Sequence, residues 1–165
     1  MILHQNTRSF ERTVLEELTV RHLRDITAPL LGTALKDPRE ASSQLVKHIR
    51  LCIPAAYDPA ATILTAYAAI SHGREICLGD VCVYDHAGVR GIGCVWFHVS
   101  IDDSLYTCLA PWEVTSDHGH FIKCRVGARA GVVATADLLA PCVYTPASAN
   151  KLATVLIPAE HRLHS

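Results

Sequence analysis

The chain has 165 residues, of which 50% are hydrophobic and 19% are charged; this composition predicts one folded domain with a buried core and excludes a disordered protein. A net charge of -1 excludes the strongly basic surface that non-specific nucleic-acid binding needs, so there is no strong nucleic-acid signal. The start, MILHQNTRSFERT, lacks the pattern of a secretory signal, and seven cysteines without CxxC pairs favour reduced thiols, so we expect a cytoplasmic protein.

The first part of the chain, residues 1–73, has the pattern of three helices. Apolar residues recur at roughly helical spacing from Phe10 until Pro29, with glutamate and arginine side chains between them. The nearly uncharged stretch 51–71 has the length of a transmembrane helix, but two prolines and an aspartate interrupt it. We therefore expect it to hold the end of one buried helix and the start of another, and we expect no membrane association.

Two aspartate–proline pairs predict the starts of the second and third helices. Asp37 can accept hydrogen bonds from free backbone N–H groups, Pro38 suits the first helical position, and Glu40 lies three residues after Asp37. The pair at residues 58–59 repeats this signal for a third helix that ends near Gly73. The side chains expected on the buried faces are Ala41, Leu45, Ile49 and Cys52 in the second helix, and Ile63, Leu64, Tyr67 and Ile70 in the third.

Residues 74–165 change to closely spaced strands and tight turns. Strands that follow a helical block predict an α+β fold, with three N-terminal helices packed on a bent, mostly antiparallel sheet or small β-barrel, in one domain over residues 1–165. Gly79, Gly91 and Gly93 would allow the sheet to bend. The segments expected to form strands are EICLGDVCVYD, VRGIGCVWFHVSIDDSLYTCLAPWEV, HFIKCRV, GVVATADLLA, CVYTP and KLATVLIP.

The longest of these segments predicts a hairpin with a two-residue turn at Asp102 and Asp103. One face of the hairpin is apolar and is expected to belong to the core, whereas the other carries Trp96, His98 and Cys94. An exposed indole would leave a large apolar area in water, so either the helices cover Trp96 or it lines a groove for a partner. The pairs expected on the apolar face are Ile101 with Ser104, Val99 with Tyr106, Phe97 with Cys108 and Val95 with Ala110.

The stretch TSDHGHFIKC, residues 115–124, concentrates side chains that metal sites and nucleophilic enzymes use. Asp117 and Gly119 suit a hairpin turn, which places His120 and Cys124 on one face of the next strand. The histidines and cysteines lack the paired spacing of a structural zinc site, so we assign no metal ligands. The stretch is predicted to be a turn.

Nucleophilic catalysis needs a cysteine or serine beside a histidine that a third group orients. Cys94 and His98 share a strand face, but four residues of strand separate them by ~13 Å. The sequence has no GxSxG motif and no phosphate-binding glycine loop followed by a helix, so we assign no catalytic residue and no cofactor. The alternative function is a small enzyme or ligand-binding protein that uses a pocket with His98, His120 or Cys124 on the concave face of the sheet.

Three segments follow one another in the layout of a known kind of small barrel. They are LGDVCVYD, the strand pair through IGCVWFHV and TCLAPWEV, and VVATADLLAPCVY, in which a short turn of helix precedes a closing strand. In this layout residues 78–145 resemble the SH3-type small barrels, and most of all the bromo-adjacent homology domain. Such modules commonly bind peptides or nucleosomal proteins through exposed aromatic residues, so the resemblance implies Trp112, Tyr106 and Tyr84 as candidates. Tyr106 is expected to fill the core instead.

The function expected from the sequence is a non-catalytic binding domain that recognises a protein or peptide partner. Apolar helix surface also allows self-association into a homo-oligomer, and a purely structural subunit is a third hypothesis. Trp112 follows Pro111 at the end of a strand and is expected to be exposed. The candidate binding residues are Trp112, Trp96, Tyr84, His98 and His120.

Overall fold

The computed structural model of this chain describes residues 32–162. Strands make up 54% of these residues, and a single α-helix, α2 (Ser43–Cys52), occurs among them. The predicted α+β fold with three N-terminal helices on a sheet is therefore wrong, because this part of the chain is mostly β. The first predicted helix, from Phe10 until Pro29, lies outside the described residues.

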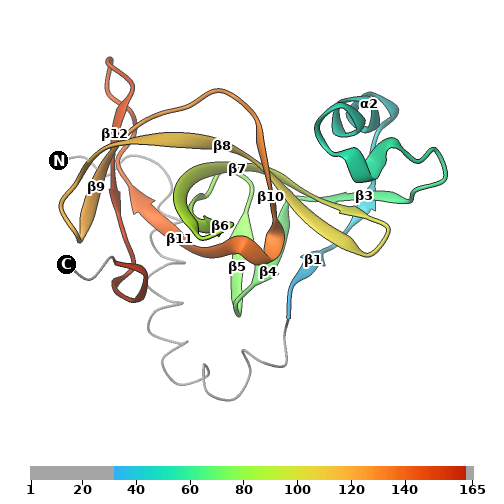
Figure 1. Cartoon of the computed structure of the whole chain (residues 1–165), viewed down its shortest axis with the longest axis horizontal. Coiled ribbons are helices and arrows are strands. Elements are labelled where there is room, and N and C mark those ends of the chain that lie inside the picture. The colour runs from blue at the N-terminus through green and yellow to red at the C-terminus, as the bar shows by residue number, and fades with distance from the viewer. Residues whose placement is uncertain (1–31, 163–165) are drawn as a thin grey trace.

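Six antiparallel strands close into a small barrel, which confirms this element of the prediction (Figure 1). Side chains that alternate along each strand fill its interior: on β9, Ile122 and Cys124 are buried, whereas Lys123 and Arg125 are exposed. The barrel strands, in their order around it, are β6 (Val81–His86), β7 (Val89–Ile101), β8 (Ser104–Asp117), β9 (Phe121–Arg125), β12 (Leu152–Leu156) and β11 (Leu138–Tyr144), which pairs back with β6.

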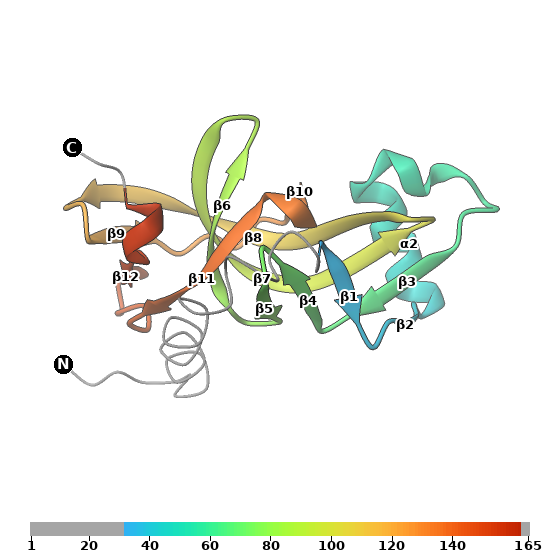
Figure 2. The ribbon, with the colours of Figure 1, turned by 90° about the horizontal axis from the view of Figure 1, so that it is seen from below.

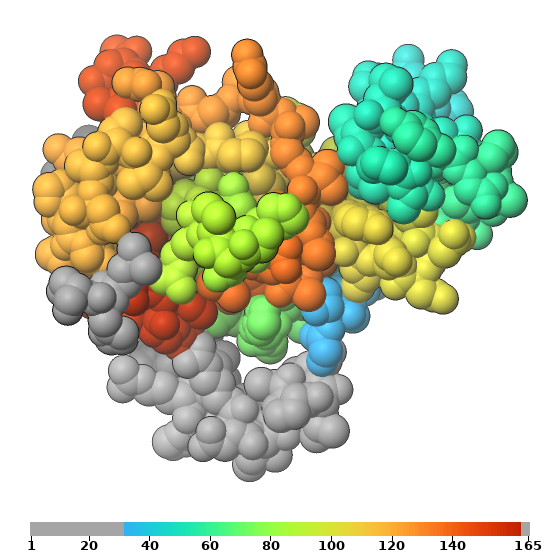
Figure 3. Space-filling view, in the orientation of Figure 1, coloured from blue at the N-terminus to red at the C-terminus, as the bar shows by residue number. Residues whose placement is uncertain are grey.

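Strands β7 and β8 are longer than the barrel needs and continue as a hairpin along the length of the molecule (Figure 2). The far end of this hairpin packs against α2, the short 3-10 helix η1 (Pro54–Tyr57) and strand β3 (Ile63–Ala66). Ile49, Ile53 and Val99 are buried at this contact. In the space-filling view the residues of α2 and η1 project as a lobe at one end of the molecule (Figure 3).

A second, three-stranded sheet lies beside the hairpin, in the order β1-β4-β5. Two further strands extend the large sheet, with β2 next to β3 and β10 next to β8. Two more 3-10 helices occur, η2 after β10 and η3 after β12. The bounds of these elements are β1 (Ala34–Lys36), β2 (Arg39–Glu40), β4 (Ala68–Ser71), β5 (Arg74–Cys77), β10 (Gly131–Ala134), η2 (Thr135–Asp137) and η3 (Ala159–His161).

Strands β3 and β4 are one extended segment that bends at Tyr67 and passes from the large sheet into the small one. Strands β2 and β1, which pair with β3 and β4, keep one register across the bend, with Arg39 opposite Thr65 and Lys36 opposite Ala68. At the bend, the Tyr67 carbonyl accepts a hydrogen bond of 2.7 Å from the backbone N–H of Leu78. The strand therefore turns a corner while its hydrogen bonds stay satisfied.

The third predicted helix, from residue 58 to Gly73, is wrong because the chain forms β3 and β4 there. His72 and Gly73 both have positive φ angles, 49° and 72°, which is the conformation of a two-residue hairpin turn between β4 and β5. The uncharged stretch 51–71 thus contains the end of α2, η1 and two strands. Within residues 32–162, no helix has the length and apolar character needed to cross a membrane.

The second predicted helix begins five residues later than expected, at Ser43 and not at Pro38. Asp37 does not cap a helix: its φ angle is 48°, and it lies at a bend in the extended segment that forms β1 and β2. The helix instead starts after Ser42, whose Oγ accepts a hydrogen bond of 3.3 Å from the Leu45 N–H. Ile49 is buried and Leu45 is partly buried as predicted, but Cys52 is exposed.

The central hairpin forms with the predicted turn and, from Ile101 back to Phe97, with the predicted register. A β-bulge between Val95 and Phe97 then shifts the pairing by one residue, so Val95 lies opposite Leu109 and not Ala110. Trp96 is the residue within this bulge. Strand β5 and η2 contact the face that carries His98.

Candidate functional site

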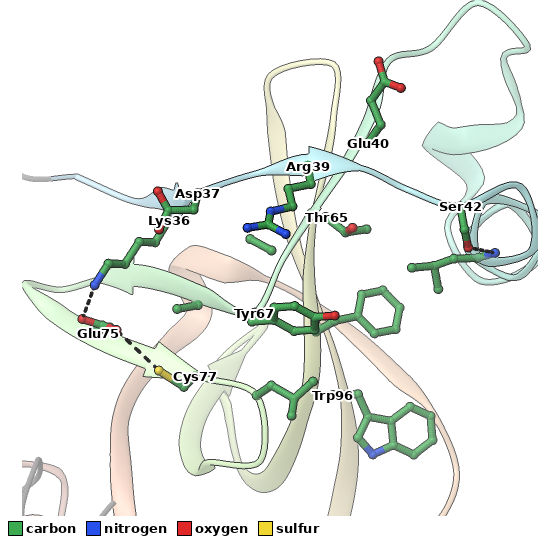
Figure 4. Close-up of a pocket in the computed structure, with 15 residues that line it drawn as sticks. Lys36, Asp37, Arg39, Glu40, Ser42, Thr65, Tyr67, Glu75, Cys77 and Trp96 are labelled. Atoms are coloured by element: carbon green, nitrogen blue, oxygen red, sulfur yellow. Dashed lines mark hydrogen bonds and ion pairs between the residues drawn. The ribbon is translucent and has the colours of Figure 1, made fainter. Parts of the chain in front are cut away.

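A groove of about 760 Å³ lies where the two sheets meet (Figure 4). Its walls come from β1 and β2, from the bend between β3 and β4, from β5, and from the bulge in β7. We call it the corner groove. The lining side chains used below are Arg39, Tyr67, Glu75, Cys77, Leu78 and Trp96.

Large apolar side chains are exposed around the corner groove. Tyr67 is 75% exposed, Leu78 is 50% exposed and Trp96 is 38% exposed. The bend places Tyr67 outside both sheets, and the bulge directs Trp96 away from the regular alternation of β7. Two irregularities of the backbone therefore bring Tyr67 and Trp96 to a cavity that Leu78 also lines, and such a group of exposed apolar side chains marks an interaction site more often than scattered single residues do.

The polar part of the corner groove contains an ion pair and the guanidinium of Arg39. Lys36 Nζ lies 3.1 Å from Glu75 Oε2, and the Cys77 thiol donates to Glu75 Oε1 at 3.5 Å. Arg39 points into the groove in Figure 4, whereas Glu40 points outward. Arg39 makes no ion pair with any residue in the described part of the chain.

His98 is fully buried behind β5 and belongs to a chain of hydrogen bonds. Its Nε2 lies 3.0 Å from the carbonyl oxygen of Ile76, and its Nδ1 lies 2.8 Å from Thr107 Oγ1, which in turn lies 3.0 Å from Thr135 Oγ1. Burial lowers the pKa of His98 from 6.5 to about 4, although the bond to the Ile76 carbonyl opposes this shift. The ring is neutral at pH 7 and fixes β5, a wall of the groove, to β7.

The buried thiols are poor nucleophiles. Burial raises the pKa of Cys124 to about 11, and the pKa values of Cys108 and Cys142 to about 12. These thiols stay protonated at neutral pH, and the thiolate is the reactive form. Among residues 32–162, no three histidine, cysteine, aspartate or glutamate side chains gather with the geometry of a metal site.

Trp112 and Tyr84 pack within the β-structure and do not line the corner groove. Trp112 is 8% exposed and meets the edge of Tyr144 in the barrel interior, at 5.7 Å between ring centroids. The expectation that Trp112 is exposed is therefore wrong. Tyr84 is half-buried, and its ring covers the positions where Gly91 and Gly93 have no side chain.

His120 is exposed at the hairpin between β8 and β9, where the predicted turn is confirmed. The Gly119 N–H donates to Asp117 Oδ1 at 2.7 Å, and Gly119 has a φ angle of 80°. The His118 and His120 rings both contact Phe121, with centroid distances of 4.5 and 4.9 Å. The histidines of this turn therefore pack on an aromatic ring.

Of the five candidate residues, only Trp96 lines the corner groove. The sequence analysis did not identify Arg39, Tyr67 and Leu78, because Tyr67 was assigned to the buried face of a helix and Arg39 to the first turn of another. The signal that could have corrected the helix assigned to Tyr67 is the His72–Gly73 pair between two apolar segments, which is a typical hairpin turn. No protein-family model matches this chain, and no curated protein is significantly similar to it.

Proposed function

We propose that this chain is a non-catalytic binding domain that holds a peptide segment of a partner protein in the corner groove. The observation that carries the proposal is the group of exposed side chains, Tyr67, Leu78 and Trp96, around one cavity of about 760 Å³. Tryptophan and tyrosine are the residues that most often contribute large binding energies at protein interfaces. A cavity of this volume accommodates a few peptide side chains.

The construction of the groove also supports binding of an extended segment. Its walls are paired strands, and the hydrogen bonds of His98 tie β5 to β7 behind it. A rigid site loses little conformational entropy when a ligand binds, which leaves more of the contact energy for affinity. The small barrel is also compatible with the likeness of residues 78–145 to the bromo-adjacent homology domain, which stays a prediction.

The alternative, a small enzyme with a pocket of histidine and cysteine side chains, has less support. His98 and Cys124 are fully buried, and burial disfavours both the charged imidazole and the thiolate. His120 packs on Phe121 in an exposed turn. These three side chains therefore offer no accessible nucleophile with an adjacent base.

The proposal is tested by selecting short peptides from a random display library against the full chain and measuring their affinities by titration. We expect Trp96→Ala to weaken binding by about 2 kcal/mol, the scale of a tryptophan at the centre of an interface. Tyr57→Ala is the matched control, because Tyr57 is 62% exposed on η1 and does not line the groove. Equal affinity of the Trp96→Ala variant and the unmodified chain would contradict the proposal, as would a library from which no peptide is selected.

A further inference from the structure

The corner groove contains both acceptor and donor groups, and two of its donors lack partners among the described residues. Arg39 and the Trp96 indole N–H can only donate, and neither has a hydrogen-bond partner in residues 32–162. The Glu75 carboxylate accepts from Lys36 and from the Cys77 thiol. Donors without partners favour a ligand that supplies acceptor oxygens.

The Arg39 guanidinium points into the groove and has no ion-pair partner among residues 32–162. Lys36 is paired with Glu75 at 3.1 Å. Glu40 points away from the groove in Figure 4, and Asp37, which also lines the groove, lies beside Lys36. The guanidinium of Arg39 points inward and matches the two oxygens of a carboxylate, with which arginine forms paired hydrogen bonds.

The position of Arg39 indicates which kind of carboxylate fits. Arg39 lies between Lys36 and Ser42 along the upper wall of the groove in Figure 4, so the lining continues on both sides of it. A peptide bound there continues past Arg39 in both directions. The carboxylate is then an acidic side chain within the segment and not the end of a chain.

We propose that the corner groove selects peptide segments in which an aspartate or glutamate pairs with Arg39 while a neighbouring apolar side chain packs against Trp96 and Leu78. This inference rests on the proposed function of the groove. It adds the chemical class of the ligand, an acidic and apolar segment of a partner protein.

The test compares each selected peptide with a copy in which its acidic residue is replaced by the corresponding amide, using the full chain. The unmodified chain should bind the acidic peptide roughly tenfold more tightly, a difference of about 1.4 kcal/mol. Arg39→Gln should remove this discrimination, and Arg39→Lys should keep part of it. Arg129→Gln is the matched control, because Arg129 is exposed, lies away from the groove and makes no ion pair with the described residues.

The outcomes separate the inference from the proposed function. If Trp96→Ala abolishes binding while acidic and amide peptides bind equally, the groove binds peptides but the acidic selectivity is refuted. Discrimination that survives in Arg39→Gln also refutes it. If blocking the peptide carboxyl terminus as an amide removes binding while the side-chain replacement does not, the terminal carboxylate is the ligand and the inference is overturned.

Discussion

The buried His98 should make folding stability depend on pH in a way that the structure specifies. The Ile76 carbonyl can only accept, so the neutral ring carries its hydrogen on Nε2 and accepts the Thr107 hydroxyl proton at Nδ1. Thr107 in turn accepts from Thr135. A proton added at Nδ1 would reverse the direction of the bond between His98 and Thr107 and place a charge in a fully buried site.

The sign and size of the effect follow from the lowered pKa of about 4, against 6.5 for a free histidine. Above pH 6.5 the ring is neutral in both states, and His98 contributes no pH dependence. As the pH falls from 6.5 to about 4, the unfolded chain takes up a proton that the folded chain does not, and stability is lost. At about 1.4 kcal/mol for each pH unit, the loss reaches about 3 kcal/mol near pH 4.

The assay is urea unfolding of the unmodified chain and of His98→Gln at several pH values between about 7 and 4. Carboxylates titrate similarly in both proteins, so the difference between their pH slopes isolates His98. We expect the variant to lose about 3 kcal/mol less over this range. An imidazole NMR titration of His98 with a midpoint near 6.5 would refute the reasoning, even if the variant does not fold.

Two further predictions concern stability, measured by urea unfolding. Glu160→Ala should cost about 3 kcal/mol, because Arg74 is 1% exposed and its guanidinium pairs with Glu160, whereas Glu113→Ala should cost less than about 1 kcal/mol, because its pair with Arg125 is exposed. Equal losses would contradict the burial of the first pair. Trp112→Ala should cost about 3–5 kcal/mol by opening a cavity in the barrel, and a change within ±0.5 kcal/mol would show that Trp112 is not in the core.

The strands and turns of residues 74–165 were predictable because their signals are local. A two-residue turn at Asp102 fixes the start of the register between β7 and β8, and Asp117 with Gly119 forms the next turn. A barrel could be predicted because the strands are closely spaced and have glycines at positions where the sheet can bend. The bulge at Trp96 was not predictable, because one extra residue in a strand leaves no signal in an alternating pattern.

The helices predicted between Asp37 and Gly73 show how tertiary contacts override local propensity. An alanine-rich sequence such as residues 60–69 favours a helix, but its strand β3 pairs with β7 on one side and with β2 on the other. The Asp–Pro signal at residue 37 does not start a helix, and the structure has a backbone bend there, with a φ angle of 48° at Asp37. Among residues 32–162, the chain forms an α-helix only where Ser42 caps it.

The corner groove could be predicted only in part. Trp96 was recognised as an indole that either helices cover or a partner contacts, and in the structure it is 38% exposed beside Tyr67. Arg39 and Tyr67 lie far from Trp96 in the sequence, and the bend of β3–β4 brings them together. Trp112 was expected at the surface because it follows a proline, but closure of the barrel buries it.

The central claim, that the corner groove is the peptide-binding site, is tested most directly by chemical-shift mapping. The isotope-labelled full chain would be titrated with a selected acidic peptide, and the backbone amide and indole signals would be followed. The account predicts that the largest shifts occur at Arg39, Tyr67, Leu78 and Trp96, with little change at Trp112 or the turn around His120. Shifts concentrated on the barrel, with the signals of the groove unchanged, would contradict it.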